Sequence, residues 1–165
     1  MVKKVNKVKK VNKVNKKPRK SRKSRKSKKT RKPRLKSISA INKRLLALWS
    51  QAVRQRDGYA CRYCGAKRDD LKPNGKKVKI DAHHIISKHI KDSALKYDIK
   101  NGISLCTSCH KFGPDSWHKN PVITMDWLII NDEVLYEYLL SRSDDRVDLR
   151  DRQVLADIEE SLNKR

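Results

Sequence analysis

Two adjacent histidines, His83 and His84, lie in the segment KIDAHHIISKHI at residues 79–90. Asn101 follows 17 residues after His84, and His110 follows nine residues after Asn101. An imidazole with an ordinary pKa of about 6.5 can take a proton from water at neutral pH, and imidazoles also bind divalent metal ions. Hydrolysis of a phosphodiester needs an activated water and a cation that relieves charge on the phosphate and the departing oxygen. These four residues are therefore candidates for a metal-dependent hydrolytic site.

Four cysteines bracket this segment as two C-x-x-C pairs separated by 41 residues. A C-x-x-C turn lets two thiolates reach one ion, and two such pairs complete the tetrahedral site that zinc prefers. A closed four-thiolate site has no open position, so we expect a structural Zn²⁺ rather than a catalytic one. Reduced bystander cysteines and a redox pair are the alternatives. The expected ligands are Cys61, Cys64, Cys106 and Cys109.

The net charge of +25 is concentrated near the N-terminus. Residues 1–36 carry 20 of the 43 basic residues and none of the 18 acidic ones, so the remainder is only mildly basic. The valines of VKKVNKVKKVNKVNKK recur every three residues, which gives no single apolar face on a helix. Because this tail repels itself and has little to bury, we expect it to be disordered in isolation.

Charge of this density favours nucleic acid as the partner, since binding releases counterions from the phosphates. A nuclear import signal and a solubility tail with no specific role are the alternatives. No run approaches the roughly 18 apolar residues of a membrane span, so no membrane partner is expected. No apolar secretory segment is present, which predicts an intracellular protein, in the cytoplasm of a prokaryotic host or the nucleus of a eukaryotic one. The cations expected to contact nucleic acid are Lys17, Arg19, Lys20, Arg22, Arg25, Arg31 and Arg34.

The elements that must position the candidate site follow from periodicity. Apolar residues at helical spacing, followed by Gly58, predict a helix over 39–57, with Trp49 as a core anchor rather than a base-stacking residue. Residues 76–86 are predicted to form a strand and 88–102 a loop. Residues 103–112 are predicted to form a short strand, the second cysteine turn and the start of a helix. The last third is predicted to be helical, and Val154, Leu155, Ile158 and Leu162 form an apolar stripe that faces the core or a partner helix.

The segments RDGYACRYCGAK, DAHHI and NGISLCTSCH together resemble the HNH nucleases over about residues 46–120. The resemblance rests on a specific combination of motifs: two C-x-x-C pairs, HH-I and N-x-x-x-L-C-x-x-C-H. The family that the chain resembles includes phage- or virus-type homing endonucleases. It implies an α+β fold: a small zinc-stabilised ββα-metal finger flanked by helices, after a disordered basic tail. The expected domains are the tail at 1–36, the nuclease domain with its preceding helix at 37–120, and a helical extension at 121–165 that packs on it.

The resemblance also implies a role for each polar residue of the finger. His84 would be the general base, His83 and His110 would bind the catalytic divalent ion, and Asn101 would hold the loop so that His84 points at the water. Where the family often has Asp, this chain has His83. A neutral imidazole favours Mn²⁺, Ni²⁺ or Zn²⁺ over Mg²⁺.

Three positions stay open from the sequence. His118 is the candidate third metal ligand, with a surface histidine or a phosphate contact as the alternative. Asp81 is a weaker ligand candidate and is better suited to orienting a metal-binding histidine. Neighbours on a regular strand point to opposite faces, so the strand must end or bulge at His83 and His84 if both serve one site. His89 is expected to face solvent or DNA.

The expected activity is hydrolysis of DNA phosphodiesters by a metal-dependent endonuclease, with double-stranded DNA as the main partner. A non-catalytic, zinc-stabilised nucleic-acid-binding protein is the alternative from another class, and a ribonuclease is a third possibility. Target sequence, oligomeric state and biological role are not visible in the sequence.

Overall fold

The computed structural model describes residues 36–164. The seven tail cations predicted to contact nucleic acid, and the predicted disorder of the tail, lie outside these residues. The helices and strands in chain order are α1 (Ile38–Arg56), β1 (Ile80–His84), β2 (Gly102–Cys106), α2 (Pro121–Asn131), α3 (Glu133–Ser141) and α4 (Arg152–Asn163). Short turns of other helical types are η1 (Ala94–Tyr97), η2 (Ile99–Asn101) and η3 (Ser108–Phe112), the last a π-type turn. The fold is α+β, as predicted.

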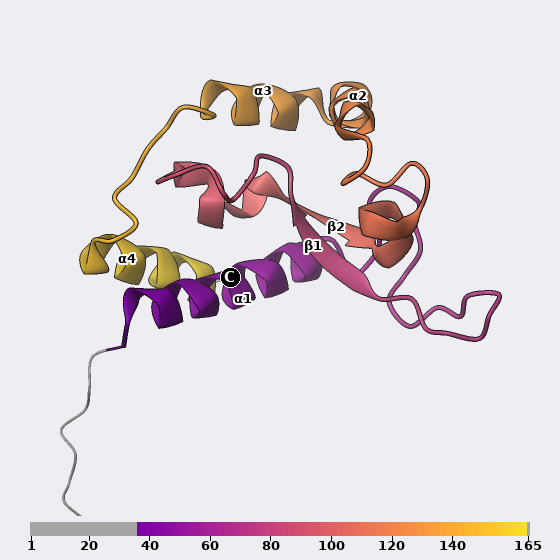
Figure 1. Ribbon diagram of the computed structural model, residues 1–165, viewed down its shortest axis with the longest axis horizontal. Helices are drawn as coiled ribbons and strands as arrows, with labels where there is room; N and C mark the ends of the chain where they lie inside the picture. The colour runs from indigo at the N-terminus through magenta and orange to yellow at the C-terminus, as the bar shows by residue number, and fades with distance from the viewer. Residues whose placement is uncertain (1–35, 165) are drawn as a thin grey trace, which may run out of the picture. The chain divides into compact units, whose positions relative to one another are not determined.

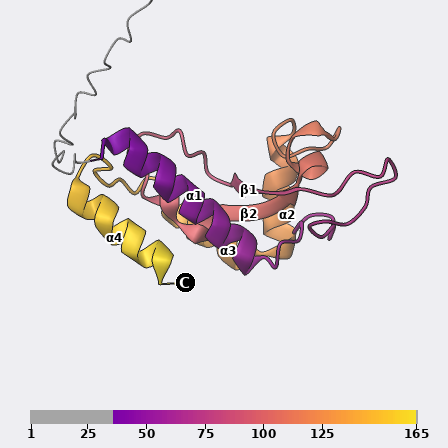
Figure 2. The same ribbon diagram turned by 90° about the horizontal axis from the view of Figure 1, so that it is seen from below.

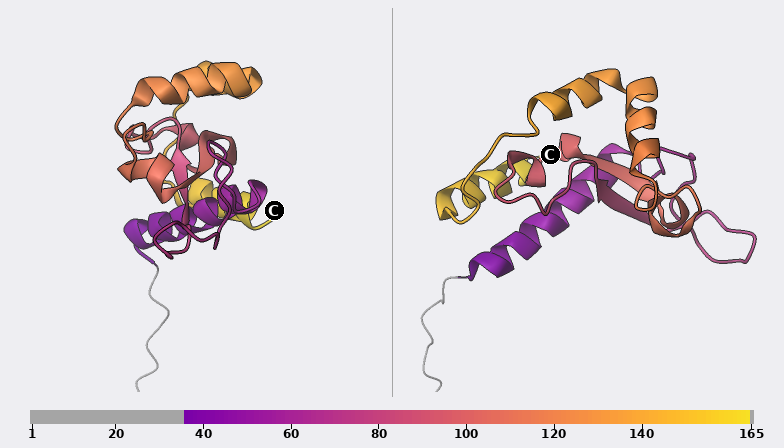
Figure 3. Two further views of the ribbon diagram at one scale, coloured as in Figure 1. Left: turned by 90° about the vertical axis from the view of Figure 1, so that its right-hand side faces the viewer. Right: turned by 45° about the horizontal axis from the view of Figure 1, so that its top comes forward.

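The elements of this unit form three layers (Figure 1). The sheet lies between α1 and α4 on one side and α2 and α3 on the other, an arrangement also visible in the left view of Figure 3. Figure 2 shows α4 beside α1, and these two helices pack together. The boundaries predicted at residues 36 and 120 stay a prediction, although the helical extension does pack on the earlier elements through α4.

Helix α1 forms because its ends are capped and one face is apolar. The Ser37 side chain accepts a hydrogen bond from the Ala40 amide at 3.2 Å, which satisfies one of the free amides of the first turn. Leu45, Trp49 and Val53 recur every four residues and are all buried. The helix predicted over 39–57 is confirmed to within one residue at each end, and Trp49 is a core residue as expected.

The sheet has two antiparallel strands in a regular register, from Ile80 opposite Cys106 to His84 opposite Gly102. No bulge interrupts the pairing within these strands, and β1 ends at His84. A side chain at Gly102 would collide with Val53 and with the Trp49 ring, 2.7 Å from the added carbon. Glycine is therefore the residue that lets α1 approach the end of the sheet.

Two apolar clusters hold the layers together. The first joins α1 to α4 and to η1 and η2. It includes Leu155 and Leu162, and Ile158 packs against it, so three of the four residues of the predicted stripe face the core, whereas Val154 is half-buried outside this cluster. The second lies around the cysteine turns and includes Ile103, Leu105 and Trp117. The segment 88–102, predicted to be a loop, contains two short helical turns. These turns, η1 and η2, pack against α1 through the first cluster.

The helical extension is joined to the middle of the chain by backbone pairing. The Ala94 amide donates to the Asp145 carbonyl at 3.1 Å, and the Val147 amide donates to the Asp92 carbonyl at 2.8 Å. Tyr138 of α3 also donates to the Asp98 carboxylate. Among residues 36–164, no helix combines the length and the apolar content needed to cross a membrane.

Candidate active site and cysteine metal site

The four cysteines come together at the end of the sheet where Ile80 pairs with Cys106. Their sulfurs all lie within 4.8 Å of one another. The Sγ atoms of Cys64 and Cys106 are 3.7 Å apart. Zinc bound tetrahedrally by thiolates at about 2.3 Å places its sulfurs about 3.8 Å from one another. The separation fits one metal ion held by both C-x-x-C pairs, so these residues are positioned to bind a metal.

Local hydrogen bonds shape each cysteine turn. The Gly65 amide donates to the Cys61 carbonyl at 2.8 Å, and Gly65 adopts a φ of +76°, which favours glycine. In the second turn the Cys109 amide donates to the Cys106 sulfur at 3.5 Å. Burial raises the pKa of Cys61 and of Cys109, so the thiols resist ionising together without a cation to balance the charge.

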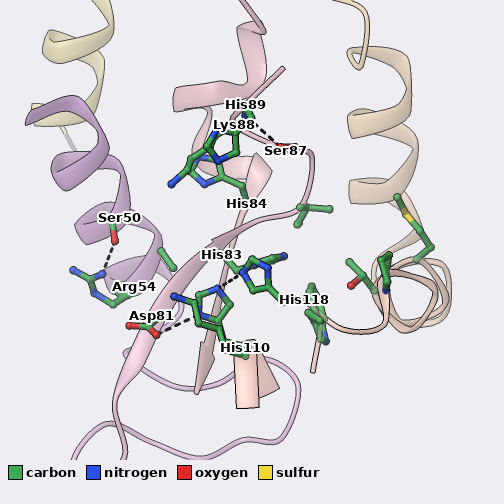
Figure 4. A pocket seen from close by; sticks show the side chains of 17 residues that line it. Ser50, Arg54, Asp81, His83, His84, Ser87, Lys88, His89, His110 and His118 are labelled. Carbon is green, nitrogen blue, oxygen red and sulfur yellow. Dashed lines mark hydrogen bonds and ion pairs between the residues drawn. The ribbon is translucent and has the colours of Figure 1, made fainter. Parts of the chain in front are cut away.

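Three histidines, His83, His110 and His118, form a second cluster (Figure 4). The ring nitrogens of His83, His110 and His118 offer one ligand atom each, all within 4.8 Å. The Nε2 atoms of His110 and His118 face each other at 3.1 Å. Two nitrogens bound to one ion at about 2.1 Å lie roughly 3.0–3.4 Å apart for tetrahedral or octahedral angles. The three imidazoles therefore fit a divalent metal ion.

Asp81 controls the tautomer of His110. The Asp81 carboxylate lies 3.2 Å from Nδ1 of His110, and because an ionised carboxylate only accepts, Nδ1 carries the hydrogen. Nε2 of His110 then has its lone pair directed at the cluster. A carboxylate that orients a metal-binding histidine in this way also raises its basicity as a ligand. Asp81 thus lies beside the cluster and orients His110, as the sequence suggested.

The cysteine turns position two of the three histidines. His110 belongs to η3, which also contains Cys109, so His110 directly follows the last cysteine of the second turn. The Trp117 amide donates to the Cys109 carbonyl at 2.9 Å, and the His118 amide donates to the His110 carbonyl at 3.3 Å. These bonds bring His118 back onto the second turn, beside His110, and its role as a metal ligand stays a prediction.

Burial favours the neutral form of two cluster histidines, His83 and His110. It lowers the pKa of His83 to about 3, with further lowering by the neighbouring His110 and His118. The pKa of His110 is also lowered by burial, against the opposing effect of Asp81. Neutral imidazole is the form that binds a metal ion.

His84 lies apart from this cluster, on the opposite face of β1, as strand alternation requires. Its ring stacks on Trp49 with centroids 3.6 Å apart and planes 15° from parallel. Its Nε2 lies 2.9 Å from the Lys96 carbonyl. A carbonyl only accepts, so Nε2 donates and the free lone pair of neutral His84 lies on Nδ1. Burial lowers the pKa of His84 to about 4, which leaves the ring unprotonated at neutral pH.

The two faces meet in one cleft because β1 ends at His84. This cleft has a volume of about 610 Å³, and His83, His84, His110 and His118 all line it. His89 and Lys88 line it too, and Figure 4 labels both in the same region of the cleft as His84. The wall also carries the cationic side chains of Arg54, Lys88 and Lys111. A cleft that places imidazoles beside cations suits an anionic substrate.

Asn101 is fully buried and uses its whole amide group. Its Oδ1 accepts from the Ile86 amide at 2.7 Å, and its Nδ2 donates to the carbonyls of Ile86 at 2.9 Å and Leu95 at 3.0 Å. The side chain therefore joins the segment after His84 to η1, which carries the Lys96 carbonyl that binds His84. The role that the resemblance implies for Asn101, holding the loop so that His84 points at the water, stays a prediction.

Replacing Asn101 with alanine should lower the free energy of unfolding by roughly 2–5 kcal/mol, because it leaves several buried backbone groups without partners at about 1–3 kcal/mol each. Urea unfolding of the variant measures this loss. The matched control is Asn131→Ala, whose Nδ2 donates to the Trp127 carbonyl on the exposed side of α2 and should cost less than about 0.5 kcal/mol. Equal midpoints for the two variants would contradict the role given to Asn101.

Residues 61–112 match the family model described as HNH endonuclease. This chain contains an HNH endonuclease domain. No curated protein and no solved structure matches the chain significantly. The HNH match includes all four cysteines and His83, His84, Asn101 and His110.

Several residues of the site lie outside the HNH match or have no signal in the sequence. Trp49 precedes the matched segment and His118 follows it, yet both contact its histidines. The Lys96 carbonyl lies inside the match, but a backbone acceptor depends on loop geometry rather than on residue type. For Trp49, the helical spacing indicated burial and could not indicate which ring it covers.

Proposed function

We propose that this protein is a metal-dependent endonuclease that hydrolyses DNA phosphodiester bonds. One observation carries the proposal: a three-histidine cluster that fits a metal ion and a separate, neutral His84 line the same cleft. A group that binds the phosphate and a group that activates water must lie on either side of a reacting phosphorus atom. This arrangement provides both within an HNH domain.

His83, His110 and His118 would hold the catalytic divalent ion. Bound there, such an ion supplies charge relief for the scissile phosphate and for the departing oxygen. Three imidazole ligands favour Mn²⁺, Ni²⁺ or Zn²⁺ over Mg²⁺, which prefers oxygen ligands. Asp81 keeps Nε2 of His110 available as a ligand atom.

His84 would take the proton from the attacking water through Nδ1. The hydrogen bond from Nε2 to the Lys96 carbonyl fixes the tautomer that makes Nδ1 the base, and it stabilises the imidazolium that forms. Trp49 covers one face of the ring and restricts its rotation. Asn101 acts one step further away, by holding η1 and the segment after His84. The products would be a 5′-phosphate and a 3′-hydroxyl.

We assign Zn²⁺ to the four-cysteine site, as a structural ion with no open coordination position. Cysteines used as metal ligands suit a reducing compartment, so we place the protein inside the cell. Double-stranded DNA is the proposed substrate, and the tail cations at 17–34 would add affinity through the phosphates without sequence preference.

Incubating the protein with supercoiled plasmid tests the proposal. Nicked circles should form with Mn²⁺, Ni²⁺, Zn²⁺ or Mg²⁺ and should not form in EDTA. Relaxation that is equally fast in EDTA would contradict a metal-dependent site. If a folded, DNA-binding protein cuts RNA but not DNA with any of these ions, the activity is that of a ribonuclease. If it cuts neither, the non-catalytic nucleic-acid-binding alternative holds.

A further inference from the structure

Residues 67–79, here called the basic ribbon, connect the first cysteine turn to β1 and have no role in the site described above. Figures 1 and 2 and the right view of Figure 3 all show the segment before β1 projecting from the other elements. It folds back on itself, with Leu71 paired to Lys77 and the Lys72 amide donating to the Lys76 carbonyl at 2.9 Å. Gly75 closes the turn at a φ of +71°.

The ribbon is strongly basic, with six cations against two carboxylates. The two carboxylates neutralise little of this charge. Asp70 accepts a hydrogen bond from the Lys67 amide, and Asp69 pairs with Arg68 and Lys77 at 3.7 Å across exposed side chains. Exposed pairs of this length contribute little energy and are readily exchanged for another anion. Lys79 has no ion pair among the described residues.

The register of the ribbon places two of these cations in line with the histidine cluster. Val78 and Ile80 are buried, whereas Lys77 and Lys79 are exposed, so the side chains alternate as in a strand. Backbone bonds maintain this extension: the Val78 amide donates to the Asp70 carbonyl at 2.7 Å. Continued into β1, the same alternation puts Lys77 and Lys79 on the face of His83.

The spacing along this face matches a track for a nucleic-acid strand. A strand advances about 3.3 Å per residue, so Lys79 lies roughly 13 Å and Lys77 roughly 20 Å from His83 along the chain direction. Cations at such intervals beyond the metal cluster would meet backbone phosphates that flank the one being cut. Contacts of this kind fix the register of the substrate and carry no sequence information.

We propose that the basic ribbon holds the DNA strand on one side of the scissile phosphate, with Lys79 and Lys77 contacting flanking backbone phosphates. This inference rests on the proposed endonuclease function and adds a second contact surface to it. The ribbon belongs to the folded unit, so its contacts are fixed relative to the cleft by β1. It therefore acts on alignment of the strand as well as on affinity.

The test compares Lys77→Gln/Lys79→Gln with the control Arg150→Gln/Lys164→Gln in the full chain. The control removes two exposed cations, at and near α4, that each pair with a carboxylate. Neither of them lines the cleft. Binding to a long duplex is measured against salt concentration. The slope of log affinity against log salt should fall by about 1.8 for the ribbon variant, since each phosphate contact contributes about 0.9. The control should keep the wild-type slope.

Two further readouts locate the contact. Ethylation of individual phosphates should weaken wild-type binding at positions on one side of the cut, and the ribbon variant should lose that sensitivity. In cleavage assays the ribbon variant should show a several-fold rise in KM and a smaller change in kcat than in KM. Equal slopes, equal KM and the same ethylation pattern in the ribbon variant and the control would overturn the inference.

The outcome is separable from that of the proposed function. If the wild type binds DNA without cutting it and the ribbon variant still loses slope and phosphate contacts, the ribbon inference holds and the nuclease proposal fails. If the wild type cuts DNA and the ribbon variant matches the control throughout, the nuclease proposal holds and the ribbon inference fails.

Discussion

Replacing His84 with alanine should lower the rate of DNA cleavage by about 100- to 10,000-fold, the usual contribution of a general base. The expected loss follows from the geometry. Nε2 is bonded to the Lys96 carbonyl, so Nδ1 is the nitrogen available to take a proton, and no other imidazole of the cleft has this arrangement among the described residues. Single-turnover cleavage of a labelled duplex with saturating Mn²⁺ measures the chemical step.

The matched control for this variant is His89→Ala. His89 lines the same cleft and lies five residues further along, but its side chain has no hydrogen bond to a backbone acceptor among the described residues. We expect a change of less than about tenfold, which corresponds to about 1.4 kcal/mol. DNA affinity should remain near that of the wild type in both variants.

A second substitution separates chemistry from packing. His84 stacks on Trp49, so alanine also removes a contact from the first apolar cluster. His84→Gln keeps a planar polar group of similar reach and cannot act as a base at neutral pH. Loss of cleavage in both variants, with melting temperatures near that of the wild type, supports the assignment. Wild-type cleavage by a folded His84→Gln protein would contradict it.

Replacing Cys64 with serine should unfold the protein. The Cys64 side chain is exposed, so serine fits sterically and the effect must come through the metal. Structural zinc sites contribute roughly 10–16 kcal/mol of apparent binding free energy. A typical domain is stable by only about 5–15 kcal/mol. Loss of the site should therefore remove the cooperative unfolding transition, which circular dichroism measures, and metal analysis should show no tightly bound ion.

His118→Ala is the control that distinguishes the two metal sites. It removes one ligand from the histidine cluster and leaves the four cysteines intact. This variant should stay folded and keep the cysteine-bound ion, while it loses the second ion and most cleavage activity. A folded Cys64→Ser protein with normal cleavage would show that the cysteine site is not structural. Unfolding of both variants would mean that the histidine cluster also stabilises the fold.

The metal-binding candidates and the buried face of α1 could be predicted because their patterns are local. A C-x-x-C turn brings two thiolates together within four residues, whatever the rest of the chain does. The helical spacing of Leu45, Trp49 and Val53 specifies a buried face for the same reason, since it depends only on the pitch of a helix. The π-type turn at His110, where a helix start was expected, is a difference of detail within this local range.

Contacts between distant parts of the chain could not be predicted in this way. The stack of Trp49 on His84 joins residues 35 positions apart, and it depends on Gly102 allowing α1 to approach the sheet. His118 joins the cluster only because backbone bonds fold its segment onto the second cysteine turn.

The sequence by itself determined the HNH-like segment at residues 61–112, the two sets of metal-binding candidates and the helices, because each depends on residue type and short spacing. The tertiary structure decided which face of β1 each histidine occupies, which nitrogen of His84 is free, and that Lys77 and Lys79 continue the line of the cluster. The physical reason is that these relations arise from strand register and from packing between segments, and neither is encoded in the spacing of any one motif.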